Sequence, residues 1–214
     1  MTQHYKSFRI DDPTIIPRIV ARWPFATIVA NGPGWPMAAQ TPLVMVDGQS
    51  AVEFHLAKAN PAMAVLQEGA KAMAILQGPS AHISPSWYLG RFPTPDSDRS
   101  RTAPTWDYLT LTLRGQLGVL ADDGVANHLS DLVARHEAPD GWQLAEIDPQ
   151  FFNELRGHIR GFRLVIEGFD CVAKFSQDKA DQDISGVIAG LIARGQGVDR
   201  EVADLVRNPG SLLE

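Results

Sequence analysis

Cysteine and long apolar runs are nearly absent from this sequence. Its 214 residues contain one cysteine, Cys171, which excludes an internal disulfide framework and a metal site built from several cysteines. The longest apolar candidate, residues 186–193, is far shorter than the roughly 18 to 20 residues of a membrane-spanning helix. The first residues lead into Asp11 and Asp12 without the apolar core of a signal peptide. We therefore expect a cytoplasmic protein.

An excess of positive charge is also lacking. Nineteen Lys and Arg residues against 25 Asp and Glu residues give a net charge of −6, the wrong sign for a protein that coats nucleic acid. Two helices expected between residues 184 and 207 suggest a helix-turn-helix, but the second carries three acidic residues, which would repel phosphates: Asp199, Glu201 and Asp204. Direct DNA binding is therefore not expected.

The common catalytic motifs are missing as well. The sequence has no Gly-x-Ser-x-Gly, His-Glu-x-x-His, P-loop or complete Gly-x-Gly-x-x-Gly motif. Its six histidines show no spacing typical of metal ligands, although His55 and His82 could converge in space. We assign no catalytic residue and no metal site, and we expect Cys171 to be buried and unreactive.

Many short strands are present instead. Eighteen glycines and 15 prolines are spread along the chain as turns. Apolar or alternating runs predict strands at 25–30, 43–46, 51–56, 70–76, 80–84, 108–114, 161–167 and 172–175. Asp47-Gly48 predicts one hairpin and Gly168 a later one. Apolar spacing predicts a helix capped by Asp122 or Asp123 and C-terminal helices within 179–208, one of which ends at Gly195. Polar residues 89–103 are expected to form an exposed loop. The pattern favours one β-barrel domain over residues 1–214 with peripheral helices.

The segment from His55 to Pro61 has the most informative local pattern. A strand ends, Lys58 follows, and Asn60 with Pro61 predicts the start of a helix that stops near Gly69. A helix N-terminus beside a lysine can hold a phosphate, because its free N–H groups and dipole attract anions. An ordinary capped helix with a solvated lysine is the alternative.

Two further segments combine polar and aromatic residues. Ser84 and Ser86 precede Trp87 and Tyr88, which could bind the edge and cover the face of a heteroaromatic ring, or form a rigid turn with core aromatics. Trp106 and Tyr108 share one strand face opposite Asp107, and we interpret them as packing residues. In a third segment, Lys174 and Ser176 share a face that could meet an anion. A lysine that protects an edge strand from aggregation is the alternative there.

These segments together resemble the PaiB-type family, known as FMN-binding negative transcriptional regulators, over residues 8 to about 195. The matching stretches are His55-Leu56-Ala57-Lys58-Ala59-Asn60-Pro61, Gly78-Pro79, Ile83 to Tyr88, Pro104-Thr105-Trp106 with Tyr108, and Lys174 with Ser176-Gln177. The positions that depart from the family pattern are Phe54, His82, Asp107, Phe175 and the stretch Ala39-Gln40-Thr41-Pro42-Leu43, which lacks a histidine. Several of these surround the expected pocket, so they affect ligand specificity.

The resemblance implies an FMN-binding split barrel, related to pyridoxamine-phosphate oxidases, that works as a homodimer with FMN at the subunit interface. It implies cofactor contacts from His55, Leu56, Lys58, Asn60, Ile83, Ser84, Ser86, Trp87, Lys174 and Gln177. A flavin-dependent redox or flavin-linked regulatory role follows, and an FMN-dependent oxidoreductase is one such activity. The alternatives are a transcriptional regulator that senses a ligand and a haem-binding split barrel with His55 or His82 as ligand.

Overall fold

The fold was analysed in a computed structural model that describes residues 6–46, 48 and 50–213. The chain divides into two compact units. The barrel unit comprises Ile19–Leu76 and Thr112–Phe169, and the helical unit comprises Met1–Arg18, Gln77–Leu111 and Asp170–Glu214. Each unit is described by itself, and a single domain over the whole chain stays a prediction.

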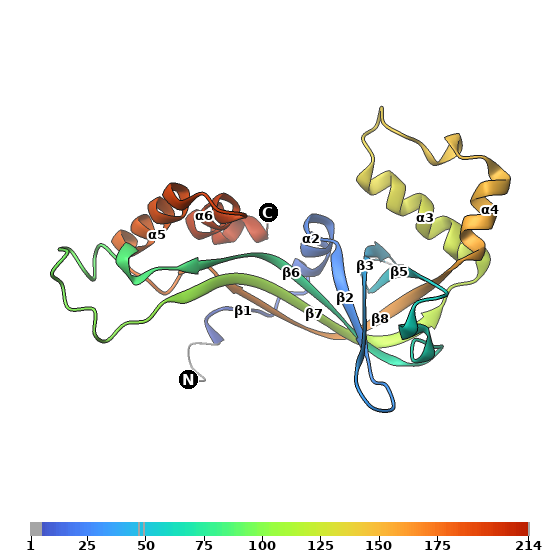
Figure 1. Ribbon diagram of the computed structural model, residues 1–214, viewed down its shortest axis with the longest axis horizontal. Helices are drawn as coiled ribbons and strands as arrows, with labels where there is room; N and C mark the ends of the chain where they lie inside the picture. The colour runs from blue at the N-terminus through green and yellow to red at the C-terminus, as the bar shows by residue number, and fades with distance from the viewer. Residues whose placement is uncertain (1–5, 47, 49, 214) are drawn as a thin grey trace. The chain divides into compact units, whose positions relative to one another are not determined.

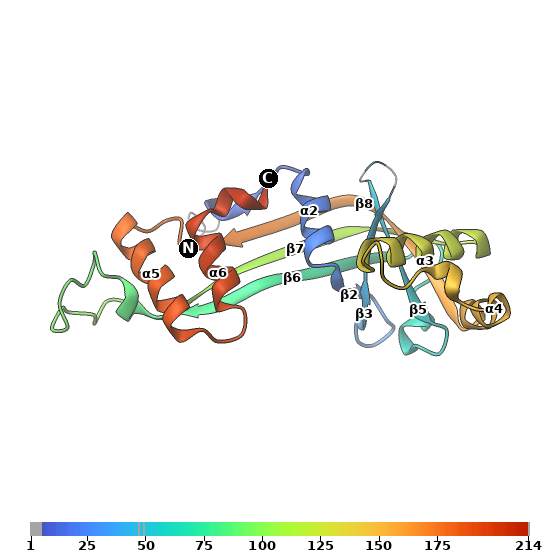
Figure 2. The ribbon, with the colours of Figure 1, turned by 90° about the horizontal axis from the view of Figure 1, so that it is seen from above.

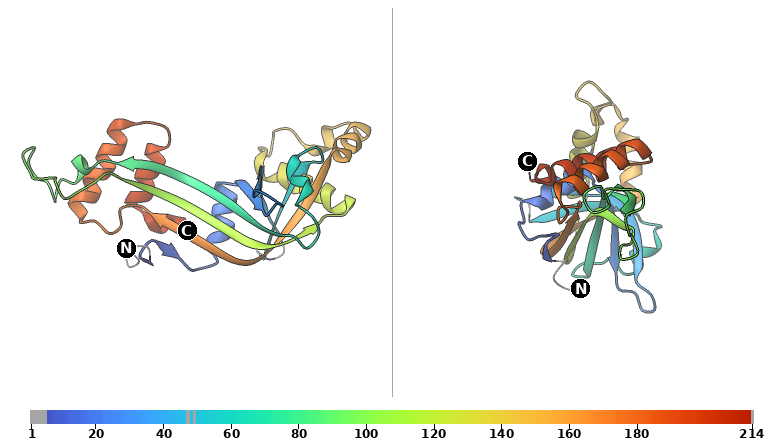
Figure 3. Two further views of the ribbon diagram at one scale, coloured as in Figure 1. Left: turned by 60° about the horizontal axis from the view of Figure 1, so that its bottom comes forward. Right: turned by 90° about the vertical axis from the view of Figure 1, so that its left-hand side faces the viewer.

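One eight-stranded sheet forms the framework (Figure 1). Its strand order is β3-β2-β6-β7-β8-β5-β4, and β1 pairs with β8. Figure 3 shows β6, β7 and β8 as long strands without a break. The strands are β1 (Arg9–Ile10), β2 (Phe25–Ala30), β3 (Met37–Pro42), β4 (Val44–Val46), β5 (Ala51–Ala57), β6 (Lys71–Ile83), β7 (Thr105–Val119) and β8 (Ile159–Lys174).

The barrel unit curls so that β3, at one end of the sheet order, contacts β5, which is next to the other end. The side-chain Oγ1 of Thr41 on β3 donates a hydrogen bond of 2.8 Å to the carbonyl oxygen of His55 on β5. Inside, Phe54 of β5 lies opposite Phe162 of β8, and the ring centroids are 5.3 Å apart. Both phenylalanines are fully buried. The expected β-barrel class is therefore confirmed, in the form of a split barrel.

Two of the expected turns are wrong. The strands expected on either side of Gly78-Pro79 form one continuous strand, β6, and the hairpin expected at Gly168 is instead the interior of β8. Gly78 has a packing role, because a Cβ atom there would lie 2.7 Å from Cδ2 of Leu109. The hairpin between β4 and β5 is confirmed by their antiparallel pairing. Gly48 has a φ of +60° in that turn, and Asp47 lies outside the described residues.

The helices agree with the sequence more closely at the C-terminal end. The described α-helices are α2 (Ile15–Arg22), α3 (Asp122–His136), α4 (Pro149–Gly157), α5 (Asp181–Arg194) and α6 (Asp199–Arg207). Helices α5 and α6 pack side by side (Figure 2), and Gly195 ends α5 in a left-handed conformation. The expected cap of α3 is wrong: Ala121 is its N-cap, and Asp122 and Asp123 lie in the first turn. Helices α2 and α4 were not expected.

The segment 89–103 is mostly exposed, as predicted, although Phe92 within it is buried. No helix among the described residues is long and apolar enough to span a membrane.

Candidate functional site

The segment after β5 differs from its expected form. Asn60 is an N-cap, since its side-chain oxygen accepts the N–H of Ala62 at 2.9 Å, but the helix that follows is a 3₁₀ turn of four residues, Pro61–Ala64. The longer helix expected up to Gly69 is wrong. So short a turn supplies little dipole. Any anion site here must therefore depend on side chains.

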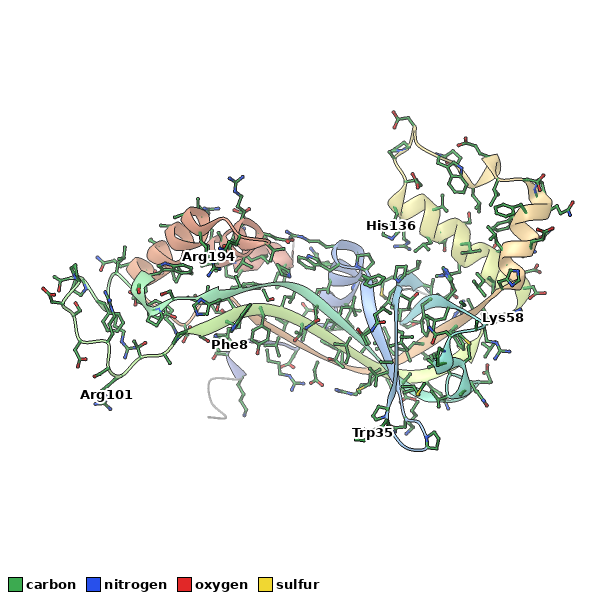
Figure 4. All side chains as sticks on the ribbon, in the orientation of Figure 1. Phe8, Trp35, Lys58, Arg101, His136 and Arg194 are labelled. Atoms are coloured by element: carbon green, nitrogen blue, oxygen red, sulfur yellow. The ribbon has the colours of Figure 1, made fainter. Side chains whose placement is uncertain are left out.

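Such side chains lie at a cavity of about 190 Å³ in the barrel unit. The Nζ atom of Lys58 (labelled in Figure 4) donates to the carbonyl oxygen of Gly157 at 2.7 Å. Arg156 donates to Oδ1 of Asn153 at 2.7 Å and to the carbonyl oxygen of Asp122 at 3.3 Å. The cavity is lined by Lys58, Asp122, Val125, Asn153, Arg156, Gly157 and Ile159.

Two cations and one carboxylate line this cavity. Nε of Arg156 has no hydrogen-bond partner among the residues that the structure describes, but it is buried from solvent. A contact between Arg156 and a ligand in the cavity would therefore come from its Nη atoms. Lys58 and Arg156 supply two positive charges, against one carboxylate from Asp122. The cavity therefore fits an anionic group such as a phosphate. Because ligand pockets usually exceed about 300 Å³, it does not fit a whole nucleotide.

His55 and Leu56 occupy different environments. Leu56 is buried in the barrel core, and its contact with a cofactor stays a prediction. His55 is half-buried, and its Nδ1 lies 3.0 Å from Nε2 of His128 on α3. His82 belongs to the helical unit, where its ring lies 6.2 Å from that of Trp106, and its convergence with His55 of the barrel unit stays a prediction.

The serine-rich turn lies in the helical unit. Ser84 caps the 3₁₀ turn Pro85–Trp87 by accepting the N–H of Ser86 at 3.2 Å, while Ile83 is fully buried. Arg194 of α5 lies 5.1 Å from the ring centroid of Trp87. The turn is therefore rigid, and one face of Trp87 packs against α5. The structure thus agrees with the second interpretation of this segment, a rigid turn. Binding of a heteroaromatic ring by Ser84 and Ser86 stays a prediction.

Arg194 (labelled in Figure 4) holds this region together through a larger network. It donates to both carboxylate oxygens of Asp199, at 2.6 and 2.7 Å, and to the carbonyl oxygen of His82 at 2.9 Å. The bidentate ion pair is the strong form of this contact, and it raises the pKa of Arg194 and lowers that of Asp199. It ties α5 to both α6 and the end of β6.

Lys174 and Gln177 are engaged by their own chain. Nζ of Lys174 donates to Oγ1 of Thr105 and to the carbonyl oxygen of Trp106, both at 2.6 Å. It also lies 3.7 Å from Oδ1 of Asp107. Because β1 pairs with β8 beside it, the interpretation of Lys174 as a guard of an edge strand is wrong. Gln177 accepts the N–H of Phe175 and donates to the carbonyl of Ala173.

Asp107 is the buried centre of this cluster. Its side chain is fully buried, its Oδ2 accepts a 2.6 Å hydrogen bond from Ser176, and burial raises its pKa. Burial also lowers the pKa of Lys174. Lys174 and Ser176 share a face, as predicted, but the anion they meet in the structure is the carboxylate of Asp107. A ligand that used Lys174 would have to exchange these contacts.

The aromatic residues of β7 form a second surface. Trp106 is 55% exposed, so its interpretation as a packing residue is wrong, whereas Asp107 points to the opposite face as predicted. A cavity of about 340 Å³ lies here, within the range for small-molecule sites. It is lined by Gln77, Gly78, Ser80, Trp106, Tyr108, Leu109 and Thr110. An exposed indole beside hydroxyl and amide groups can hold a flat heteroaromatic ring.

Cys171 is fully buried, and burial raises its pKa to about 12. The thiol is therefore protonated and unreactive, as expected. Within the described part of the chain, no group of three or more His, Cys, Asp or Glu side chains could hold a metal ion.

Sequence reasoning missed Arg156 and His128. They lie 98 residues from Lys58 and 73 residues from His55 along the chain, and no local motif marks either of them.

Comparison with known proteins supports a flavin-related assignment. Residues 4–168 match the model of a family described as "Putative FMN-binding domain". The chain is 26% identical over 210 residues to "Protease synthase and sporulation protein PAI 2" of Bacillus subtilis, which covers 95% of each chain.

Solved structures share the fold. A "FAD and Heme binding protein" of Mycobacterium smegmatis has a TM-score of 0.61 at 19% identity, covering 83% of this chain and 79% of that one. The "Flavocytochrome Anf3" of Azotobacter vinelandii has a TM-score of 0.63 at 16% identity, covering 85% and 76%.

Proposed function

The chain belongs to the family of FMN-binding domains, and from this premise we propose that it is a homodimeric flavoprotein whose Lys58 and Arg156 hold the phosphate of FMN. The observation that carries the assignment is the cavity that these two cations line together with a single carboxylate, that of Asp122. Bound FMN would supply the electron transfer, while the protein binds, orients and shields it.

We propose that the helical unit, taken by itself, offers contacts to a flat ring such as isoalloxazine. The cavity at Trp106 offers an exposed indole face with Ser80 and Gln77 beside it, and Ser84, Ser86 and Trp87 form the adjacent turn along β6. Lys174 and Gln177 remain proposed cofactor contacts because the family resemblance implies them. A bound cofactor would have to replace their present hydrogen-bond partners. In a homodimer, phosphate and ring contacts need not come from one chain.

Exposed apolar side chains support the homodimer. Phe25, Met73 and Val165 on strands of the barrel unit are 64%, 37% and 48% exposed. Contact with a second copy of the chain would remove such apolar side chains from water. Sedimentation at micromolar concentration should give twice the chain mass of 23.4 kDa. A monomer at that concentration would contradict the dimer.

The phosphate assignment predicts a difference between FMN and riboflavin. Replacing Lys58 or Arg156 by alanine should weaken FMN binding by about 10-fold to 100-fold each, since a hydrogen bond to a charged group contributes about 1.5 to 3 kcal/mol. Riboflavin lacks the phosphate, so its affinity should stay unchanged. Fluorescence titration of flavin into the purified protein measures both.

The matched control is Lys71→Ala, which removes a cation from a different cavity of the barrel unit. It should leave both affinities unchanged. Equal losses for FMN and riboflavin in the Lys58 and Arg156 variants would contradict the phosphate assignment. If the protein binds no flavin, and a Soret band develops with haemin, the haem-binding alternative is favoured instead.

A regulatory role of the flavoprotein is the second candidate, favoured by the resemblance to the family of transcriptional regulators. The net charge of −6 argues that any such role does not use direct DNA contact. A gel-shift assay at low salt with the purified protein should show no shift.

A further inference from the structure

A chain of polar side chains crosses the contact between β5 and α3 in the barrel unit. Glu53 and His55 are two residues apart on β5, so their side chains share one face, and His128 faces them from α3. Nδ1 of His55 lies 3.0 Å from Nε2 of His128, and Nδ1 of His128 lies 3.9 Å from Oε2 of Glu53. His128 is fully buried and Glu53 is 4% exposed. Because water is excluded, electrostatic preferences here are strong.

Arg163 of β8 fixes the orientation of the carboxylate. Its Nε and Nη2 atoms donate to Oε1 of Glu53 at 2.9 and 2.6 Å. The guanidinium offsets the buried negative charge, while the other oxygen, Oε2, is the one that faces His128. Two further side chains donate to main-chain carbonyl groups nearby: Thr41 donates to that of His55, and Arg135 of α3 donates to that of Met45.

Both imidazoles are neutral at neutral pH. Burial and the neighbouring His55 lower the pKa of His128 to about 4, and burial lowers the pKa of His55. Two neutral rings share one proton across their hydrogen bond, which allows two arrangements. Either His55 donates from Nδ1 and His128 carries its own proton on Nδ1, or His128 donates from Nε2 and leaves a bare lone pair on Nδ1.

The carboxylate distinguishes these arrangements. A protonated Nδ1 of His128 facing Oε2 of Glu53 is attractive, whereas a lone pair there is repulsive. At 3.9 Å the contact is too long for a hydrogen bond, but this electrostatic preference remains. Nδ1 of His128 has no hydrogen-bond partner among the described residues, so no hydrogen bond competes with this preference.

We propose that Glu53 and His128 are positioning residues that keep His55 protonated on Nδ1, so that Nε2 of His55 presents a free lone pair to a bound ligand. Among the described residues, no hydrogen bond to Nε2 of His55 is formed, and the side chain is half-buried. The ligand class is a molecule with an N–H or O–H donor. If the proposed function holds, on which this part rests, the donor is a ribityl hydroxyl of FMN.

Histidine tautomers in the ¹⁵N-histidine-labelled, flavin-free protein test the proposal directly. Long-range ¹H–¹⁵N correlation spectra at neutral pH should show His55 and His128 both protonated on Nδ1. In Glu53→Gln, Arg163 should hold the amide oxygen and turn the amide NH₂ toward His128. Nδ1 of His128 must then accept, so both histidines should switch to the Nε2–H form. A wild-type His55 protonated on Nε2 would overturn the proposal, whether or not the variant folds.

Glu68→Gln is the matched control, because Glu68 is another carboxylate of the barrel unit and accepts the N–H of Val119 at 2.6 Å. It should leave both tautomers unchanged. In flavin titrations, Glu53→Gln should weaken binding about tenfold relative to Glu68→Gln, since His55 would then present a donor to a donor. Equal affinity in the two variants would overturn the ligand contact. Absence of flavin binding in the wild type would refute the proposed function but leave the tautomer result as an independent test.

Discussion

Substituting alanine at Gly186 or Gly190 of α5 should destabilise the protein by about 1 to 3 kcal/mol or more, the cost of forcing extra atoms into a packed contact. A Cβ atom at Gly186 would lie 1.9 Å from the carbonyl oxygen of Trp87, and one at Gly190 would lie 2.3 Å from the Trp87 ring. In an exposed helix the same change would stabilise by about 1 kcal/mol, because alanine favours helix. In α5 the close contact with Trp87 makes the substitution destabilising instead. Urea unfolding measures the change in the free energy of unfolding.

The two positions differ in how they can be rescued. At Gly190 the obstacle is a side chain, so Trp87→Ala should remove most of the penalty, and the double mutant should be far from additive. At Gly186 the obstacle is main chain, so Trp87→Ala should rescue little. Gly124→Ala of α3 is the control: its Cβ would have only ordinary contacts of 3.4 Å or more with Leu120. Stabilisation by alanine at Gly186 or Gly190 would contradict this packing.

Elements with a local signal were predicted from the sequence, whereas features that depend on contacts between distant residues were not. The strand at 25–30 has its expected bounds, and the helix at 199–207 lies within the expected region 179–208. Their signals are local: an apolar run before Asn31-Gly32, and an acidic first turn. Gly78 and Gly168 were misread as turns. Gly78 is a glycine because Leu109 of β7 approaches it, a cause that lies 31 residues away and has no local signature.

The two helices missed by the sequence analysis show another limit. Helix α2 contains Pro17 in its first turn, where proline is tolerated. Helix α4 has a clear start at Asp148 and Pro149, and its Phe151 and Leu155 remain 51% and 43% exposed. The two helices have eight and nine residues, so each offers little periodicity to detect.

The candidate site likewise contains residues that a local motif predicts and residues that it does not. Lys58 and Asn60 were found from local chain chemistry, and the N-cap was correct. The cation that completes the cavity, Arg156, and the histidine that meets His55 come from helices far along the chain. Their place depends on how α3 and α4 pack against β5 and the start of β8. A motif of consecutive residues therefore gives only part of this site.

The stability of the protein should fall by about 2 kcal/mol between about pH 7.5 and pH 5 because of His128 alone. Its pKa is about 4 in the folded protein, against an ordinary value of 6.5, because burial and His55 disfavour the charged ring. The unfolded chain therefore binds more protons between these two values. The contribution is fully present above pH 6.5 and is lost as the pH falls toward 4. His55, whose pKa burial also lowers, acts with the same sign.

Urea unfolding of the wild type and of His128→Gln across this range tests the effect. The glutamine does not titrate, so the variant should lose about 2 kcal/mol less than the wild type over the same interval, whatever its stability at pH 7.5. The control is His136→Gln, at the exposed end of the same helix, which should keep the wild-type slope. The carboxylate of Glu53 does not turn the lowered pKa of His128 into a raised one, because Arg163 already pairs with that carboxylate at 2.6 Å. Parallel profiles for the wild type and His128→Gln would show that His128 accepts a proton in the folded state and would contradict a neutral pair between β5 and α3.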